Sequence, residues 1–151
     1  MTLPYHTPLD RQTLTDHGVP ADWPFGVADR VRFHELDPLG HVNNAAYLTW
    51  FENFRFHYLR AYGLVRSDSG LGGLVLRALS VDYRASLLLG ESYITVGRTV
   101  AMRTNSFSME YGVFSGGLKV TSTAVIVLVK PDGRTTRPIP ETVRRMFIAR
   151  D

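Results

Sequence analysis

The 151-residue chain contains no cysteine. This absence excludes disulfide bonds, a thiolate nucleophile, and zinc or iron–sulfur sites held by cysteine. It also fits a reducing compartment, where structural disulfides are rare. A catalytic group has to be sought among the other residue types.

Long apolar runs are also missing. No stretch approaches the roughly 20 apolar residues that a membrane-spanning helix needs. The start of the chain, MTLPYHTPLDRQTLTDHGVP, lacks the charged beginning and apolar run of a signal peptide. We therefore expect a soluble, cytoplasmic protein without a membrane partner.

Lysine is scarce. Only Lys119 and Lys130 are lysines among the 17 basic residues, and the formal net charge is +3. Arginine side chains suit phosphate groups, because the guanidinium fork matches phosphate oxygens. The excess of positive charge is small and scattered, whereas nucleic-acid binding needs a clustered basic stripe. Phosphate-bearing small ligands are therefore compatible with this composition, and nucleic acid is not expected.

Two regions differ in periodicity. Residues 1–26 hold four of the eight prolines and show little pattern, so we expect an irregular N-terminal arm. Residues 27–151 contain the periodic segments and are expected to form a single domain. Within them, residues 27–36 alternate in polarity, which predicts a half-buried strand. Continued alternation would place Asp37 on the core side, together with Val31 and Phe33.

A long helix is predicted next. Asn43 or Asn44 can cap its first turn, because an asparagine side chain accepts a bond from a free backbone N–H. Gly63 is the expected residue just beyond its end. Aromatic residues recur at spacings of three and four along one broad apolar stripe: Tyr47, Phe51, Phe54, Tyr58 and Tyr62. The width of this stripe predicts a helix that is wrapped on more than one side.

The remaining pattern has period two, with turns at Gly90, Gly116-Gly117 and Pro131-Asp132-Gly133. It predicts four strands, at residues 72–86, 91–104, 105–117 and 118–130. A short C-terminal helix follows, with Pro140 near its first turn. The fold class is α+β, a five-stranded antiparallel sheet wrapped around one long helix. Such a sheet has exposed edges, and one of them can pair with a second copy of the chain.

The sharpest motif is DPLGHVNNAAYLTWFENFR, residues 37–55. With this order of elements it resembles the hotdog fold, and within it the 4-hydroxybenzoyl-CoA thioesterase-like branch of acyl-CoA thioesterases. The family pattern is an acidic residue before a glycine turn, a His/Val/Asn segment, Tyr-Leu, and a Glu–Arg pair on the helix. The matching positions here are Asp37, Gly40, His41 to Asn44, Tyr47-Leu48, Glu52 and Arg55.

The resemblance implies hydrolysis of an acyl-CoA thioester without a cofactor. It also implies a homodimer, or a dimer of dimers, with active sites at the subunit interface. The catalytic acid matches Asp37, which would act either as nucleophile or as general base. The oxyanion donor matches the backbone N–H of Asn44, with Asn43 as its neighbour, at the electropositive start of the helix. His41 would line the pocket or hold the turn.

Other candidates follow from residue type. Tyr47 is a candidate for the border of the acyl pocket, and Arg98 and Arg103 are candidates for CoA phosphates. Glu52 and Arg55 are expected to pair with each other along the helix, in a structural role. A metal trio of His34, Asp37 and His41 lacks further ligands, so no metal is expected.

Three alternatives remain open at this stage. Asp-Pro-Leu-Gly can be a plain β-turn capped by Asp37. A hotdog hydratase or dehydratase would pair His41 with an acid. A non-catalytic acyl-ligand-binding subunit would keep the fold and show no turnover.

Overall fold

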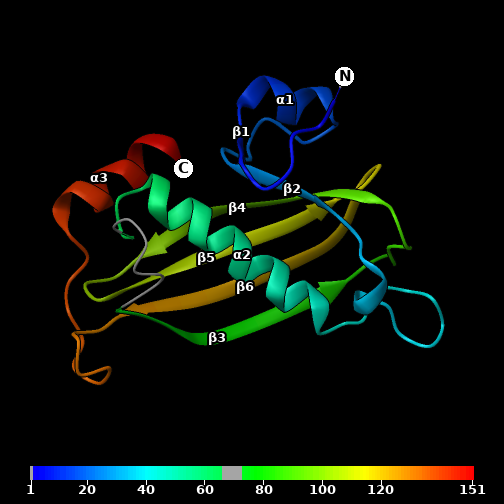
Figure 1. The fold of residues 1–151 in the computed structure, drawn as a ribbon. Coiled ribbons are helices and arrows are strands. Elements are labelled where there is room, and N and C mark those ends of the chain that lie inside the picture. The colour runs from blue at the N-terminus through cyan, green and yellow to red at the C-terminus, as the bar shows by residue number, and fades with distance from the viewer. Residues whose placement is uncertain (1, 66–72) are drawn as a thin grey trace.

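The computed structural model describes residues 2–65 and 73–151. Six strands form one antiparallel sheet in the order β1-β2-β4-β5-β6-β3, with helix α2 lying across one face (Figure 1). The strands are β1 (Pro8–Leu9), β2 (Gly26–Arg30), β3 (Leu74–Tyr83), β4 (Ser92–Met102), β5 (Ser106–Phe114) and β6 (Leu118–Leu128). The helices are α1 (Arg11–Asp16), the 3-10 turn η1 (Phe33–Glu35), α2 (Ala46–Ala61) and α3 (Glu141–Arg150). Within the described ranges no helix is long and apolar enough to cross a membrane.

The predicted α+β hotdog architecture is confirmed, with six strands instead of five. The four predicted strands correspond to β3, β4, β5 and β6, although residue 72, the predicted start of the first, lies outside the described residues. The sixth strand is β1, which comes from the N-terminal segment and pairs with β2. Two residues are too few to produce a detectable period, so β1 leaves no signal in the sequence.

The N-terminal segment is not irregular throughout, contrary to the prediction for residues 1–26. Besides β1 it contains α1, whose first turn is capped by Asp10: the Thr13 N–H donates to Asp10 Oδ1 at 2.8 Å. Leu14 of α1 is buried against Ile94 and other residues of a second apolar cluster. The segment thus covers apolar side chains of the sheet that do not face α2.

Helix α2 forms the main core with the sheet. The predicted aromatic stripe is confirmed, because Tyr47, Phe51, Phe54, Tyr58 and Tyr62 are all buried. Gly63 follows with a φ of 85°, the left-handed conformation expected just beyond a helix end. The predicted cap is wrong: α2 begins at Ala46, its N-cap is Ala45, and no side chain caps it.

The predicted strand at residues 27–36 is too long. β2 ends at Arg30, and η1 follows. Glu35 explains the change, because its carboxylate accepts the Arg32 N–H and the Trp50 indole N–H. These bonds fold the chain back toward α2 and leave Phe33 exposed instead of buried. The predicted strand alternation therefore does not determine the direction of the Asp37 side chain.

Asp151 ties α3 to α2 and the sheet. The hydroxyls of Tyr58 and Tyr62 donate to its carboxylate. The Thr99 N–H also donates to Asp151 Oδ2, at 2.7 Å. The register of β4 against β5 shifts between Thr99 and Ala101. The register shift thus begins at Thr99, the strand residue whose N–H donates to the Asp151 carboxylate.

Gly97 allows α2 to approach β4 closely. A Cβ at this position would lie 2.4 Å from Phe54 Cε1 and 2.8 Å from Phe54 Cζ. We expect Gly97→Ala to lower the free energy of unfolding by about 1–3 kcal/mol, because the buried ring has to move. Urea unfolding followed by circular dichroism measures this. Gly112→Ala is the matched control, since its nearest side-chain atom lies 3.2 Å away. An equal or larger loss in the control would contradict the close approach as the cause.

Candidate active site

The loop between η1 and α2 is held at several points. Its two arms meet in an isolated backbone bridge between Leu36 and Val42, and a second bridge joins His41 to Leu88. The Asp37 N–H donates to the His41 carbonyl at 2.7 Å, and the Asn43 N–H donates to the Glu35 carbonyl at 2.7 Å. These bonds make a tight loop that presents residues 37–44 beside the start of α2.

The Asp37 carboxylate is fixed through one oxygen. Asp37 Oδ1 accepts the Leu39 N–H at 2.9 Å and the His41 N–H at 3.1 Å. Oδ2 has no hydrogen-bond partner among residues 2–65 and 73–151, and the residue is half-buried. The interpretation of Asp37 as a turn cap is thus correct for one oxygen only. The other remains available to a ligand or a water molecule.

The start of α2 presents a free donor. Asn43 occupies the neighbouring N–H groups: its side-chain Oδ1 accepts from Ala45 and its carbonyl accepts from Ala46. The Asn44 N–H makes no hydrogen bond within the described part of the chain. Asn44 is itself held in place, because the Tyr83 hydroxyl donates to its carbonyl at 2.7 Å. This donor lies in the turn that leads into α2, where the helix macrodipole is positive.

His41 contributes to the site through its backbone. Its N–H holds Asp37, whereas its imidazole is exposed and makes no hydrogen bond to any residue that the structure describes. The predicted role in holding the turn therefore has a structural basis. An acid–imidazole pair between Asp37 and His41 is not present in this geometry.

Tyr47 lies directly behind the loop. Its ring centroid is 4.7 Å from that of Trp50 and 5.5 Å from that of Tyr83. Burial raises the pKa of the Tyr47 phenol, although a hydrogen bond with the Leu87 backbone opposes the shift. The Tyr47 phenol is therefore neutral. Together with Trp50 and Tyr83 it forms an aromatic wall behind the loop. Sequence reasoning missed Tyr83 as a member of this wall, because it comes from the strand that follows α2 and has no fixed spacing to Tyr47.

The two predicted arginines do not join Asp37. Arg98 points to the sheet face opposite α2, where it pairs with Asp22 and Glu110 at 3.0 Å each. The Trp23 ring centroid lies 4.5 Å from its guanidinium carbon. Arg103 follows the far end of β4, away from the Asp37 loop (Figure 1). A CoA-phosphate contact at either residue stays a prediction, and the structure does not bring these residues to the loop.

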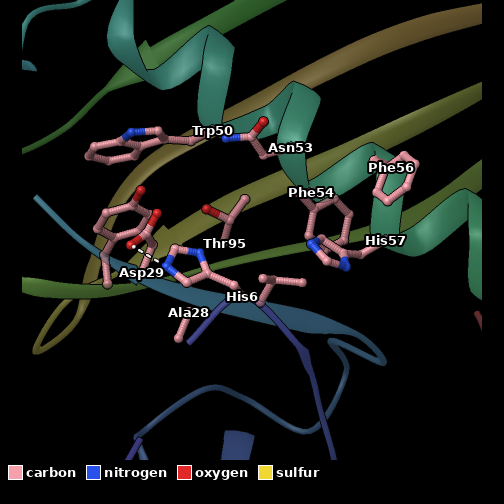
Figure 2. A pocket seen from close by; sticks show the side chains of 11 residues that line it. His6, Ala28, Asp29, Trp50, Asn53, Phe54, Phe56, His57 and Thr95 are labelled. Atoms are coloured by element: carbon pink, nitrogen blue, oxygen red, sulfur yellow. Dashed lines mark ion pairs between the residues drawn. The ribbon is translucent and has the colours of Figure 1, made fainter. Parts of the chain in front are cut away.

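A hollow of about 170 Å³ lies beside α2, on the side of β2 (Figure 2). His6 and Asp29 lie side by side in its lining, with Nε2 and Oδ1 3.5 Å apart (Figure 2). Burial lowers the pKa of His57, and the positive Arg60 and nearby His6 add to the shift. The lining residues are His6, Val27, Ala28, Asp29, Trp50, Asn53, Phe54, Phe56, His57, Tyr93 and Thr95.

The predicted catalytic residues do not line this hollow. Trp50 links the hollow to the Asp37 loop, because it lines the hollow and its indole N–H donates to Glu35 of η1. The polar residues Asn53 and His57 are spaced i, i+4 on α2, and this spacing is the only signal of the hollow in the sequence. Across the described residues, no group of three or more His, Asp or Glu side chains is placed to hold a metal ion.

Comparison with known proteins identifies the family. Residues 31–147 match the thioesterase-like superfamily. A crystal structure of a thioesterase superfamily protein from Jannaschia sp. CCS1 is 41% identical and has a TM-score of 0.91, covering 99% of this chain and 96% of that one. The match spans most of the chain, so the protein belongs to the thioesterase-like superfamily.

Two further relatives are informative. A thioesterase from Thermus thermophilus, crystallised with coenzyme A and zinc, is 34% identical with a TM-score of 0.74; the match covers 84% of this chain and 94% of that one. Protein THEM6 of Danio rerio is 35% identical over 85 residues, which are 56% of this chain and 42% of that protein. The chain therefore matches less than half the length of this curated relative.

Proposed function

We propose that the protein hydrolyses an acyl-CoA thioester at the Asp37 loop. One observation carries the proposal: Asp37 has one oxygen fixed by two backbone N–H groups, while its other oxygen and the Asn44 N–H of the same loop make no hydrogen bond within the described ranges. Thioester hydrolysis needs an oxygen nucleophile and a donor for the developing oxyanion. This loop offers a candidate for each. The coenzyme A bound to the Thermus thermophilus thioesterase supports the same substrate class.

Two routes are consistent with this arrangement. As general base, Asp37 Oδ2 takes a proton from water, whose oxygen attacks the carbonyl carbon. As nucleophile, Oδ2 attacks directly and forms an anhydride that water then hydrolyses. In both routes the carbonyl oxygen becomes negative beside the Asn44 N–H, and the C–S bond breaks to release CoA. Single-turnover hydrolysis in oxygen-labelled water separates them, since only the second route can leave label in Asp37.

The experiment that tests the proposal is a panel of acyl-CoA substrates with detection of the released thiol. Free CoA is the expected product. Formation of a double bond would instead identify a hydratase or dehydratase, and saturable binding without turnover would identify a non-catalytic subunit. The absence of an Asp37–His41 side-chain hydrogen bond favours hydrolysis over the hydratase alternative, which depends on that pair.

Two exposed leucines, one in the loop and one bridged to it, suit a ligand with an apolar portion. Leu39 is 81% exposed and Leu88 is 49% exposed, and the Leu88 backbone bridges to His41. We expect Leu88→Ser to raise KM roughly tenfold with little change in kcat, because partial burial of a leucine contributes about 1–1.5 kcal/mol. Steady-state kinetics measures this. Ile148→Ser on α3 is the control, being exposed and distant from the loop; an equal effect there would argue against a contact at Leu88.

A further inference from the structure

The hollow between α2 and β2 contains a buried hydroxyl without a partner. Thr95 of β4 lines this hollow, and only 3% of the residue is exposed. Its side chain makes no hydrogen bond within residues 2–65 and 73–151. In the same ranges, every side-chain nitrogen or oxygen that is closed off from solvent has a hydrogen-bond partner. The Thr95 hydroxyl therefore reaches the open space of the hollow, where Figure 2 shows the side chain between Asn53 and His6.

Three further polar side chains line the hollow without a partner. The Tyr93 phenol comes from the same face of β4 as Thr95, two residues earlier, and is 3% exposed. Asn53 is exposed, His57 is half-buried, and both project from α2. None of these side chains makes a hydrogen bond within the part of the chain that the structure describes. Buried polar groups in folded proteins are normally hydrogen-bonded, so water or a ligand has to supply the bonds here.

The charges around the hollow are balanced. The Asp29 carboxylate lies 3.4 Å from Arg32 Nη2 and 3.5 Å from His6 Nε2. Burial lowers the pKa of His57, so its imidazole is uncharged at neutral pH. Burial raises the pKa of the Tyr93 phenol, which is uncharged as well. An ionic ligand would therefore find no unpaired opposite charge in this lining, whereas an uncharged ligand needs none.

His6 has an unusual backbone conformation beside the hollow. Its φ is 59°, the only positive value among the non-glycine residues that the structure describes. Residues other than glycine are rarely found in this region, and those that are held there cluster at functional sites. The His6 N–H donates to the Ala28 carbonyl at 3.0 Å, which fixes this residue on β2. The imidazole consequently lies beside Asp29 in the lining of the hollow.

We propose that this hollow binds a small uncharged molecule that carries an amide or hydroxyl group on an apolar body. The four unpartnered side chains can donate and accept hydrogen bonds, as amide and hydroxyl groups also can. Trp50, Phe54 and Phe56 provide an apolar wall for the body of the ligand. The volume of about 170 Å³ suits a compact molecule and is too small for a complete acyl-CoA. The site is separate from the Asp37 loop, whose residues do not line it.

Three probes with one carbon skeleton test the charge and the location together. They are isobutyramide, the isobutyramidinium ion and the isobutyrate ion, which differ mainly in charge. Isobutyramide is expected to bind with a Kd on the order of 1 mM, as for a ligand of this size. In nuclear magnetic resonance of isotope-labelled protein it should shift the signals of Thr95, Asn53 and His57. Each ion should bind at least about tenfold more weakly, because its charge loses water without gaining a partner.

Thr95→Val tests the buried hydroxyl. Valine keeps the shape of the side chain and removes the hydroxyl, so isobutyramide should bind about tenfold more weakly. The free energy of unfolding should not decrease, because no protein group loses a hydrogen bond. Thr99→Val is the matched control on the same strand. The Thr99 hydroxyl lies 2.9 Å from that of Tyr58, so this variant should lose stability and keep its affinity for isobutyramide.

Several outcomes would overturn the proposal. Absence of any shift at about ten times the expected Kd would show that water alone fills the hollow. Tighter binding of either ion, or shifts confined to residues 37–44, would contradict the charge argument or the location. Unchanged affinity in Thr95→Val would exclude the hydroxyl as a contact, and Asn53→Ala on the exposed side of α2 provides a second test without altering the core. Acyl-CoA hydrolysis by Thr95→Val should match the wild type, and its loss would contradict a site separate from the Asp37 loop.

Discussion

Asp37→Asn is expected to lower kcat/KM for acyl-CoA hydrolysis at least about 100-fold, the low end of what a positioned acid–base group contributes. Asparagine keeps an oxygen that accepts the Leu39 and His41 N–H groups, so the turn should persist. It removes the negative charge that the proposed reaction requires on the other oxygen. The measurement is steady-state kinetics on the best acyl-CoA substrate, with circular dichroism to verify the fold.

The chain offers a matched control for this substitution. Asp132 Oδ1 also accepts two backbone N–H groups, from Arg134 and Thr135, at 2.8 Å each. It occupies an exposed turn after β6, distant from the start of α2. Asp132→Asn should therefore leave turnover unchanged. Near wild-type turnover of Asp37→Asn would contradict the assignment, and loss of activity in Glu52→Gln instead would transfer the catalytic role to the α2 carboxylate.

The architecture could be predicted because periodicity reports burial directly. Alternation marks the long strands, and the aromatic spacing marks α2, since one side of each element faces a continuous core. The loop that carries Asp37 follows a different rule. Its conformation depends on Glu35 accepting bonds from Arg32 and from Trp50, which is 15 residues later. A local pattern contains no record of such a contact, so periodicity alone predicts a strand that is too long.

The same distinction applies to charged residues. Sequence spacing predicts a Glu52–Arg55 pair on a free helix, but burial turns Arg55 toward Tyr111, a residue on β5. From its residue type, Arg98 is expected to be free to bind phosphate. In the structure it forms ion pairs with Asp22 and Glu110, which come from two separate segments. Pairings between distant segments depend on the tertiary fold. The candidate acid Asp37 and the candidate donor Asn44 could be proposed from the sequence because both lie within one short motif.

Alkaline pH is expected to unfold the protein steeply. Burial raises the pKa of Tyr58 and Tyr93 far above the ordinary tyrosine value, and the carboxylates of Asp151 and Asp29, respectively, add to the shifts. The folded state therefore keeps these phenols protonated at a pH where the unfolded chain loses the protons. These two phenols do not change the stability below about pH 10, and above it each lowers the free energy of unfolding by about 1.4 kcal/mol per pH unit. Urea unfolding at a series of pH values gives this slope.

Tyr58→Phe isolates one contribution. The variant loses the hydroxyl that contacts Thr99 and Asp151, so its stability at neutral pH should decrease. Above about pH 10, the fall of its free energy of unfolding with pH should nevertheless be shallower by about 1.4 kcal/mol per pH unit. The reason is that the variant has one phenol fewer that loses its proton on unfolding. In the wild type, tyrosinate absorbance from the buried rings should appear together with the loss of the near-ultraviolet dichroism of packed aromatics. Full tyrosine ionisation in a chain that keeps this dichroism would show that the phenols titrate without unfolding, and would contradict their burial in the core.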